Sequence, residues 1–376
     1  MTIASDYLVE FMHQALARDQ EGGLWTWSES FDYLREGWQI ADCRRMLREV
    51  KGLVVSQELG PVTLVLVRAA EGMLEAQLGH WDRAIACYRQ ALEAIQKAGD
   101  RGSEAWLLSN LGNIYYLADQ LPLALDSFEE TLTIYQELGN ERSEALVLTN
   151  LGNVYRDGGR LDEAGACYER ALALQRQHGR DGVVAITLAN LGSVLQLQER
   201  WTEAETAYKT ALSLFAKVGD LHAQAQVLGN LGTLYLNNDQ VERALECFIQ
   251  DLDLNQRLGD HASQAQTLNN LAIARRRLGR PDEALRYYEH SLALKHELGD
   301  RHGELTTLIN LCHLHQERGD LAATHRCLRE ARALAQELGD GERLVRIEKL
   351  EAEMVSQRYG TGDLPVGVHP PSTGHQ

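Results

Sequence analysis

The chain has 376 residues, with 37 Lys and Arg against 54 Asp and Glu, so its formal net charge is −17. A hydrophobic share of 44% excludes a wholly disordered chain, and the length allows two ordinary domains or one repeat array. The acidic excess disfavours nucleic-acid and anionic-membrane partners. No apolar run approaches the ~18–20 residues that span a bilayer, and the N-terminus carries acids where a secretory signal carries Lys or Arg. We therefore expect a cytoplasmic protein.

The first 60 residues precede the regular part of the chain. Residues 1–20 are predicted to form a helix, and 24–60 hold a helix, a Gly and a second helix that closes on Leu59-Gly60. This order matches the units that follow. Residues 1–60 are therefore predicted to contain N-terminal helices and a divergent first repeat.

Residues 61–340 repeat with a period of 40 residues. Six successive units share an Asn-Leu pair, from Asn110-Leu111 to Asn310-Leu311. A Gly also marks every junction, at Gly99, Gly139, Gly179, Gly219, Gly259, Gly299 and Gly339. A regular period of this length is typical of stacked repeats, and it predicts seven repeats rather than separate domains.

Each unit is predicted to form two helices. In 141–157 the apolar residues follow a spacing of three to four, which gives one helix face, and 161–177 shows a second such stripe after a turn at 158–160. The junction Gly suits the left-handed residue that ends a helix, and the Asp that often follows it, such as Asp220, can cap the next helix. Neither helix can bury its stripe alone, so the pairs are expected to stack into an all-α solenoid.

The C-terminal end departs from the repeat. Residues 341–358 alternate apolar side chains with charges, which predicts a capping helix. Residues 359–376 hold three of the six prolines together with Gly, Ser and Thr, and we expect this tail to be disordered.

The repeat resembles the tetratricopeptide repeat (TPR). The motif Leu108, Leu111-Gly112, Tyr115, Ala124, Phe128 has its order and spacing, and the 40-residue length is similar to the subclass in cell-polarity scaffolds and kinesin light chains. The Pro usual near the end of the second helix is absent, and the Gly-Asp junction stands in its place. The resemblance covers 61–340. It implies a right-handed α-solenoid superhelix of antiparallel helix pairs, with the first helix of each pair lining a concave groove.

An asparagine column on the first helices is the main candidate site. Its members are Asn110, Asn150, Asn190, Asn230, Asn270 and Asn310. Asn lowers helix propensity by up to ~0.7 kcal/mol relative to Ala, so six copies need an explanation. One interpretation is that each amide bonds the neighbouring repeat and sets the stacking. The other is implied by the resemblance: an Asn at this place clamps the backbone of an extended peptide, since an amide both donates and accepts.

Further residues of the first helices are expected to face the same groove. The candidates for peptide binding are Trp106, Asn113, Asn153, Arg276 and Arg277. The run Arg275-Arg276-Arg277 either grips a carboxylate or forms a solvated helix end. Charges at the groove positions nearly cancel, so the net charge of −17 does not predict a basic ligand.

No catalytic, metal or cofactor site is predicted. Cys87, Cys167, Cys247 and Cys327 occupy one repeat position and are interpreted as packing residues. His313 and His315 lie about 200° apart on a helix, which is poor metal geometry. The sequence contains no phosphate-binding loop, nucleophile elbow or HExxH motif.

The preferred hypothesis is a non-catalytic scaffold that binds a peptide segment of a partner protein through the asparagine column. The alternative is a ligand- or peptide-sensing regulatory module that acts in trans on a signalling effector. Self-assembly by end-to-end stacking is a third hypothesis, and the oligomeric state is left open.

Overall fold

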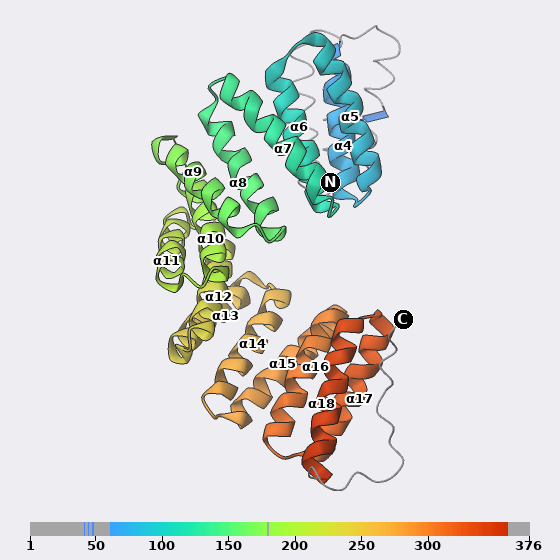
Figure 1. Ribbon diagram of the computed structural model, residues 1–376, viewed down its shortest axis with the longest axis vertical. Coiled ribbons are helices and arrows are strands. Elements are labelled where there is room, and N and C mark those ends of the chain that lie inside the picture. Colours follow the sequence, from blue (N-terminus) through green and yellow to red (C-terminus); the bar gives the residue numbers. More distant parts are fainter. Residues whose placement is uncertain (1–40, 42–43, 45–46, 49–60, 179, 360–376) are drawn as a thin grey trace, which may run out of the picture. The chain divides into compact units, whose positions relative to one another are not determined.

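The computed structural model describes residues 61–178 and 180–359, together with residues 41, 44, 47 and 48 (Figure 1). The predictions for the first 60 residues, for the junction at Gly179 and for the tail beyond Tyr359 therefore fall almost wholly outside the described residues. The chain divides into two compact units, Met1–Glu199 and Arg200–Gln376, and each is considered by itself.

Every described element of both units is an α-helix. The first unit contains α4 (Pro61–Gln77), α5 (Trp81–Ala98), α6 (Arg101–Leu117), α7 (Leu121–Glu137), α8 (Glu141–Asp157), α9 (Leu161–His178) and α10 (Asp181–Leu197). The second contains α11 (Trp201–Val218), α12 (Leu221–Asn237), α13 (Val241–Leu258), α14 (His261–Arg277), α15 (Pro281–Leu298), α16 (Arg301–Glu317), α17 (Leu321–Leu338) and α18 (Gly341–Tyr359). We call the first helix of each 40-residue repeat its A helix and the second its B helix.

Consecutive helices pack as antiparallel pairs. The A and B helices of one repeat contact each other in α4–α5, α6–α7 and α8–α9 of the first unit, and in α12–α13, α14–α15 and α16–α17 of the second (Figure 1). The predicted all-α array of antiparallel pairs is therefore confirmed. The right-handed superhelix and the limits of the predicted domains stay predictions.

The Gly-Asp junctions end one helix and start the next. Gly219 has φ 77° and caps the C-terminus of α11, and the Asp220 carboxylate then accepts from the Ala223 backbone N–H at 3.0 Å to cap α12. The same arrangement joins α13 to α14, where Gly259 has φ 68°. Both caps stabilise helix ends whose backbone groups have no partner within the helix.

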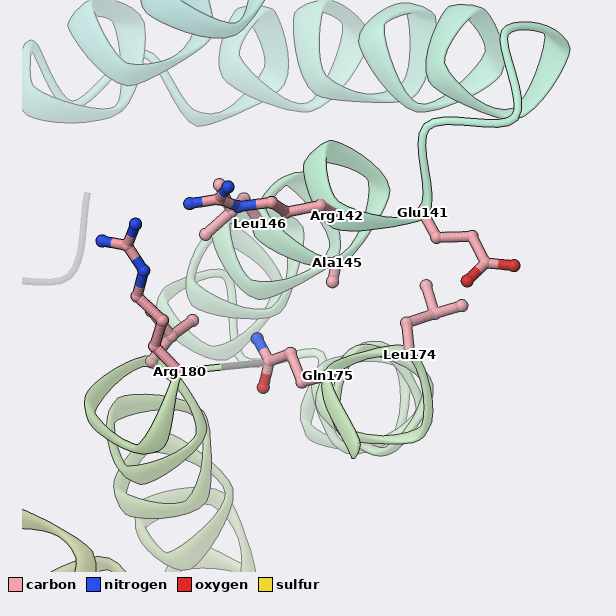
Figure 2. A pocket seen from close by; sticks show the side chains of 8 residues that line it. Glu141, Arg142, Ala145, Leu146, Leu174, Gln175 and Arg180 are labelled. Atoms are coloured by element: carbon pink, nitrogen blue, oxygen red, sulfur yellow. The ribbon is translucent and has the colours of Figure 1, made fainter. Parts of the chain in front are cut away.

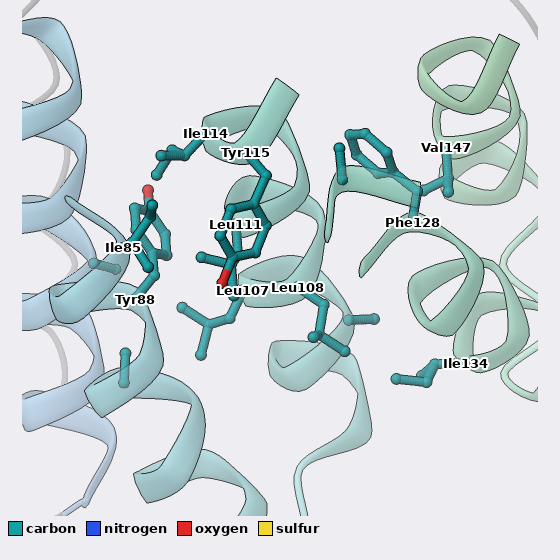
Figure 3. Close-up of a cluster of buried hydrophobic side chains, with 14 of the residues drawn as sticks. Ile85, Tyr88, Leu107, Leu108, Leu111, Ile114, Tyr115, Phe128, Ile134 and Val147 are labelled. Atoms are coloured by element: carbon teal, nitrogen blue, oxygen red, sulfur yellow. The ribbon is translucent and has the colours of Figure 1, made fainter. Parts of the chain in front are cut away.

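A second glycine position permits close packing inside several repeats; in α14–α15 Ala272 stands there instead, buried beside Tyr288. A methyl group added at Gly112 on α6 would lie 2.8 Å from the ring of Phe128 on α7, and one added at Gly72 would lie 2.6 Å from Tyr88. The buried rings therefore lie directly against the A-helix backbone. Figure 3 shows Tyr88 and Ile85 on one side of the A-helix residue Leu111 and Phe128 on the other.

In the last repeat, α16–α17, different residues fill the space between the A helix and the B helix. Cys312 replaces the glycine, and Leu328 replaces the aromatic ring; both side chains are buried in one cluster. The smaller Leu leaves room for the thiol. This exchange conserves the filled volume between the two helices.

Candidate functional site

The predicted site residues lie on A helices that are neighbours in space. In the first unit α8 contacts both α6 and α10, and in the second unit α14 contacts both α12 and α16. We call the surface of α6, α8 and α10 the first A-helix face, and that of α12, α14 and α16 the second A-helix face.

On the first A-helix face the amides bond one another across repeats. Asn150 Nδ2 donates to Asn113 Oδ1 at 3.2 Å, and Asn190 Nδ2 donates to Asn153 Oδ1 at 3.1 Å. Asn153 Oδ1 also accepts from the Tyr168 hydroxyl at 2.7 Å. Asn150 and Asn190 therefore make the hydrogen bonds between repeats that the first interpretation of the asparagine column expects.

Exposed apolar side chains accompany these amides. Trp106, Leu146 and Ile186 occupy one repeat position on α6, α8 and α10, and they are 40%, 47% and 50% exposed. Asn110 Nδ2 donates to the Trp106 carbonyl of its own helix at 2.8 Å. Three exposed large apolar residues in one row mark a surface that a partner can cover.

A small apolar pocket opens beside the middle of this row. It measures about 90 Å³ and is lined by Glu141, Arg142, Ala145, Leu146, Leu174, Gln175, Arg180 and Val183. Figure 2 shows the guanidinium groups of Arg142 and Arg180 on one side of the pocket and the Glu141 carboxylate on the other. Gln175 Nε2 donates to the Thr187 hydroxyl at 3.0 Å, which holds the floor of the pocket in place.

On the second A-helix face the column behaves differently. Asn310 Nδ2 donates to Asn269 Oδ1 at 3.1 Å. Within the described residues of the second unit, the side chains of Asn230 and Asn270 have no hydrogen-bond partner. The cause for Asn270 is local, because Thr233 stands where the first unit has Asn153, and its hydroxyl donates to the Gly229 carbonyl at 2.9 Å.

The two unpaired amides line a polar cavity of about 330 Å³ between α12, α13 and α14. Its lining consists of Ala225, Gln226, Gly229, Asn230, Thr233, Asp251, Asn255, Ser263, Gln266, Thr267 and Asn270. We call this space the Asp251 cavity. It holds both hydrogen-bond donors and acceptors and has one ionisable side chain in its lining.

Asp251 is a carboxyl group buried at the base of this cavity. The residue is 5% exposed and accepts from Asn255 Nδ2 and from the Thr267 hydroxyl, each at 2.7 Å. Burial raises the pKa of Asp251 to about 6, and the nearby charge of Asp260 acts in the same direction. A methyl group added at Gly229 would lie 3.2 Å from Asp251 Oδ2, so the glycine leaves the carboxylate open to the cavity.

Asp251 was absent from the residues predicted from the sequence, because only A-helix positions were expected to reach the groove. A signal was present in the repeat. The B-helix position of Asp251 is otherwise filled by small residues, namely Ala91, Thr131, Ala171, Ala211, Ser291 and Ala331. One acid among six small residues indicates a local change of environment.

The arginine run at the end of α14 makes contacts within the second unit. Arg276 Nη1 lies 3.6 Å from Glu317 Oε1 of α16, and Arg277 Nη1 donates to the Leu236 carbonyl of α12 at 2.6 Å. Both predicted binding residues thus link neighbouring A helices. Their role toward a ligand stays a prediction.

The described residues offer little for metal or thiol chemistry. No group of three or more His, Cys, Asp and Glu among them is placed to hold a metal ion. Burial raises the pKa of Cys247 to about 11, which keeps the thiol protonated. Cys312 belongs to a buried cluster against which Cys327 packs. In the portion of the chain that is described, no helix has the length and apolar character to cross a membrane.

Comparison with known families identifies the repeat. The tetratricopeptide repeat family matches residues 67–137, 143–217, 183–250, 223–297 and 263–337, which together exceed half of the chain. A search of curated protein sequences gave no match.

Several solved structures share the fold over most of the chain. The quorum sensor NprR from B. thuringiensis has a TM-score of 0.67 at 17% identity, covering 88% of this chain and 96% of its own. A Rap protein in complex with competence and sporulation factor has a TM-score of 0.59 at 16% identity, with 90% and 99% covered. Aspartyl phosphate phosphatase F from Bacillus subtilis has a TM-score of 0.64 at 17% identity, with 88% of each chain covered.

Identities this low establish a common fold and no more. The family match rests on the repeat motif itself, in the same residues that carried the resemblance. The chain belongs to the tetratricopeptide repeat family.

Proposed function

We propose that the chain is a peptide-sensing module, in which the second A-helix face binds a short extended peptide and the bound protein acts in trans on an effector. Repeats of this family are in general modules that bind proteins or peptides. The observation that carries the proposal is the pair of unpaired amides, Asn230 and Asn270, on the second A-helix face. An amide can bond the N–H and the C=O of a peptide backbone at once.

The size of the face suits a short peptide. Packed helices lie about 8–10 Å apart, so α12, α14 and α16 span on the order of 20 Å. An extended chain advances about 3.3 Å per residue, and roughly six residues therefore cross three A helices. The similar structures support this choice of ligand, since one is of a quorum sensor and another contains competence and sporulation factor.

A scaffold that holds a segment of a folded partner is the second candidate function. The exposed row of Trp106, Leu146 and Ile186 favours it, because burial of such side chains drives protein association. Under either function the protein is proposed to be non-catalytic. One of the similar structures is a phosphatase, so the full chain should be assayed against an aspartyl-phosphorylated protein; accelerated loss of phosphate would contradict this part of the proposal.

A binding screen with free peptides tests the first candidate. The full chain is mixed with pools of synthetic six-residue peptides, thermal unfolding identifies pools that stabilise it, and calorimetry measures single hits. Asn230→Ala with Asn270→Ala should weaken a hit about tenfold or more, as expected for two lost hydrogen bonds.

The matched control changes an equal number of amides away from the second face. Asn150→Ala with Asn190→Ala should leave the affinity of the same hit within about twofold, because these amides already bond Asn113 and Asn153. Pools that never stabilise the chain, while a folded partner binds it, would favour the scaffold.

A further inference from the structure

We propose that the Asp251 cavity is a binding site for the guanidinium group of an arginine side chain. The inference deepens the proposed function, since the arginine would belong to the peptide on the second A-helix face. It rests on the position of Asp251, on the shape of the cavity and on the acceptors that surround it.

The first step is the lack of a cationic partner for Asp251. Across the described part of the chain, no Lys, Arg or His side chain forms an ion pair with this carboxylate, and the charged group that acts on it is Asp260. A buried carboxylate is stabilised by pairing with a cation. The second unit supplies two hydrogen bonds, from Asn255 and Thr267, but no cation, and a cationic ligand would provide the missing partner.

The second step is that packing does not require an acid here. At the same position Thr131 and Ser291 are buried and donate to the backbone carbonyls of Ser127 and Ala265, at 2.7 and 2.6 Å. Other repeats place Ala there. A neutral residue therefore fills this position in the other described repeats. Packing alone does not explain the carboxyl group of Asp251.

The third step is the access of the cavity to the carboxylate. Gly229 has no side chain over Asp251 Oδ2, whereas the first unit has Thr149 and Ala189 at the same repeat position. The cavity of about 330 Å³ lies at the lower end of the range of small-ligand pockets, about 300–1,000 Å³. This volume suits one side chain better than a whole peptide.

Among cations, guanidinium fits the acceptors of this cavity best. Guanidinium has five N–H donors in one plane and therefore needs several acceptors. Each Asp251 oxygen accepts one internal hydrogen bond and keeps acceptor capacity. The residues Asn230, Asn270 and Gln266 line the same cavity, and their side-chain amides each have an oxygen that can accept from the remaining donors.

The test compares two probes of nearly the same shape that differ in charge and in the N–H donors that come with it. N-acetyl-arginine amide and N-acetyl-citrulline amide have nearly the same shape, but citrulline is neutral. Each is titrated into the full chain, and NMR follows the methyl groups of Ala225, which lines the cavity, and Ala185, its counterpart in the first unit. We expect the arginine probe to bind at least about tenfold more tightly and to shift Ala225 but not Ala185.

Three variants separate the carboxylate from its surroundings. Asp251→Asn should abolish the preference for arginine over citrulline. Gly229→Ala should weaken binding of the arginine probe while it keeps the charge, because the added methyl group covers Oδ2. Asp253→Asn, the same charge change at an exposed position of α13, should leave the preference intact.

Equal binding of the two probes, or a preference that survives in Asp251→Asn, overturns the proposal. Failure of the proposed function looks different. In that case the arginine probe binds in the cavity although no six-residue peptide stabilises the chain. Peptide hits without any preference for arginine over citrulline would instead keep the function and overturn this site.

Discussion

The two A-helix faces are built from copies of the same repeat motif, but their asparagines differ in hydrogen bonding. On the first face Asn150 and Asn190 bond across repeats, and the row that includes Trp106 exposes apolar surface. On the second face Asn230 and Asn270 have no hydrogen-bond partner within the described second unit, and they line a cavity with the buried Asp251. The comparison teaches that a shared motif position does not imply a shared role. For Asn190 and Asn270 the difference lies in the preceding A helix, which has Asn153 in one case and Thr233 in the other.

The largest expected effect concerns Asp251, the acid at a repeat position that has no acid in the first unit. The pKa of Asp251 rises from 3.8 to about 6 on folding, so the folded state binds more protons between these values and its stability falls as the pH rises through them. Asp251→Asn should therefore stabilise the chain at pH 8 by up to about 3 kcal/mol. The gain should shrink as the pH falls from 6 to 4.

Urea unfolding of the full chain at several pH values measures this difference. The titratable groups near the site are Asp260, at the start of α14, and His222 of α12, whose Nδ1 lies 3.9 Å from the Asp260 carboxylate. Asp260→Asn serves as the control for their contribution. If the free energy of unfolding of Asp251→Asn depends on pH as that of the unchanged chain does, burial does not raise the pKa of Asp251.

The next effect tests a feature that the two units have in common. Gly152→Ala and Gly232→Ala should each cost about 1–3 kcal/mol, because the new methyl groups meet the rings of Tyr168 and Phe248. Gly182→Ala is the matched control, since nothing lies within 4 Å of its added methyl group. Chemical denaturation measures all three. A marked difference between Gly152 and Gly232 would mean that the units differ in packing as well as in surface.

A smaller effect separates the two kinds of amide. Asn150→Ala with Asn190→Ala removes two hydrogen bonds between repeats, whereas Asn230→Ala with Asn270→Ala removes none within the described second unit. All four sites are inside helices, so the gain in helix propensity cancels. The first double variant should be less stable by about 2 kcal/mol in total. Equal stabilities would remove the distinction between the faces.

The smallest effect on stability is expected in the apolar row. Leu146→Ser with Ile186→Ser should lower the free energy of unfolding by about 0.5–1 kcal/mol per site, because about half of each side chain is already exposed. Affinity for a partner that covers the first face should fall about tenfold. Calorimetry with that partner measures the loss of affinity. Unchanged binding would mean that the partner does not contact the row.

The sequence predicted the fold closely because the fold is local. The helix predicted over 141–157 is α8, the turn follows at 158–160, and the Gly-Asp junctions have the expected capping geometry where they are described. Period, spacing and capping residues act over a few positions. A single repeat therefore contained most of the information needed for the helix pairs.

The site was predicted only in part because it depends on pairs of repeats. The position of the asparagine column was clear, but whether an amide is paired depends on Asn153 in one repeat and Thr233 in another. Asp251 reaches the second face from a B helix only because Gly229 is small. A motif that describes each position separately does not predict how residues on two neighbouring helices change together.

The contact between an A-helix glycine and a B-helix ring also bears on how such an array changes in length. Unequal recombination that removes 40 residues joins the A helix of one repeat to the B helix of another. Where Gly112, Gly152 and Gly232 meet Phe128, Tyr168 and Phe248, such a junction again places a glycine against a ring. In the last repeat Cys312 and Leu328 are buried together, so a junction there places a thiol against a ring. We therefore expect repeats with the glycine–ring pair to be gained or lost more readily than the last one.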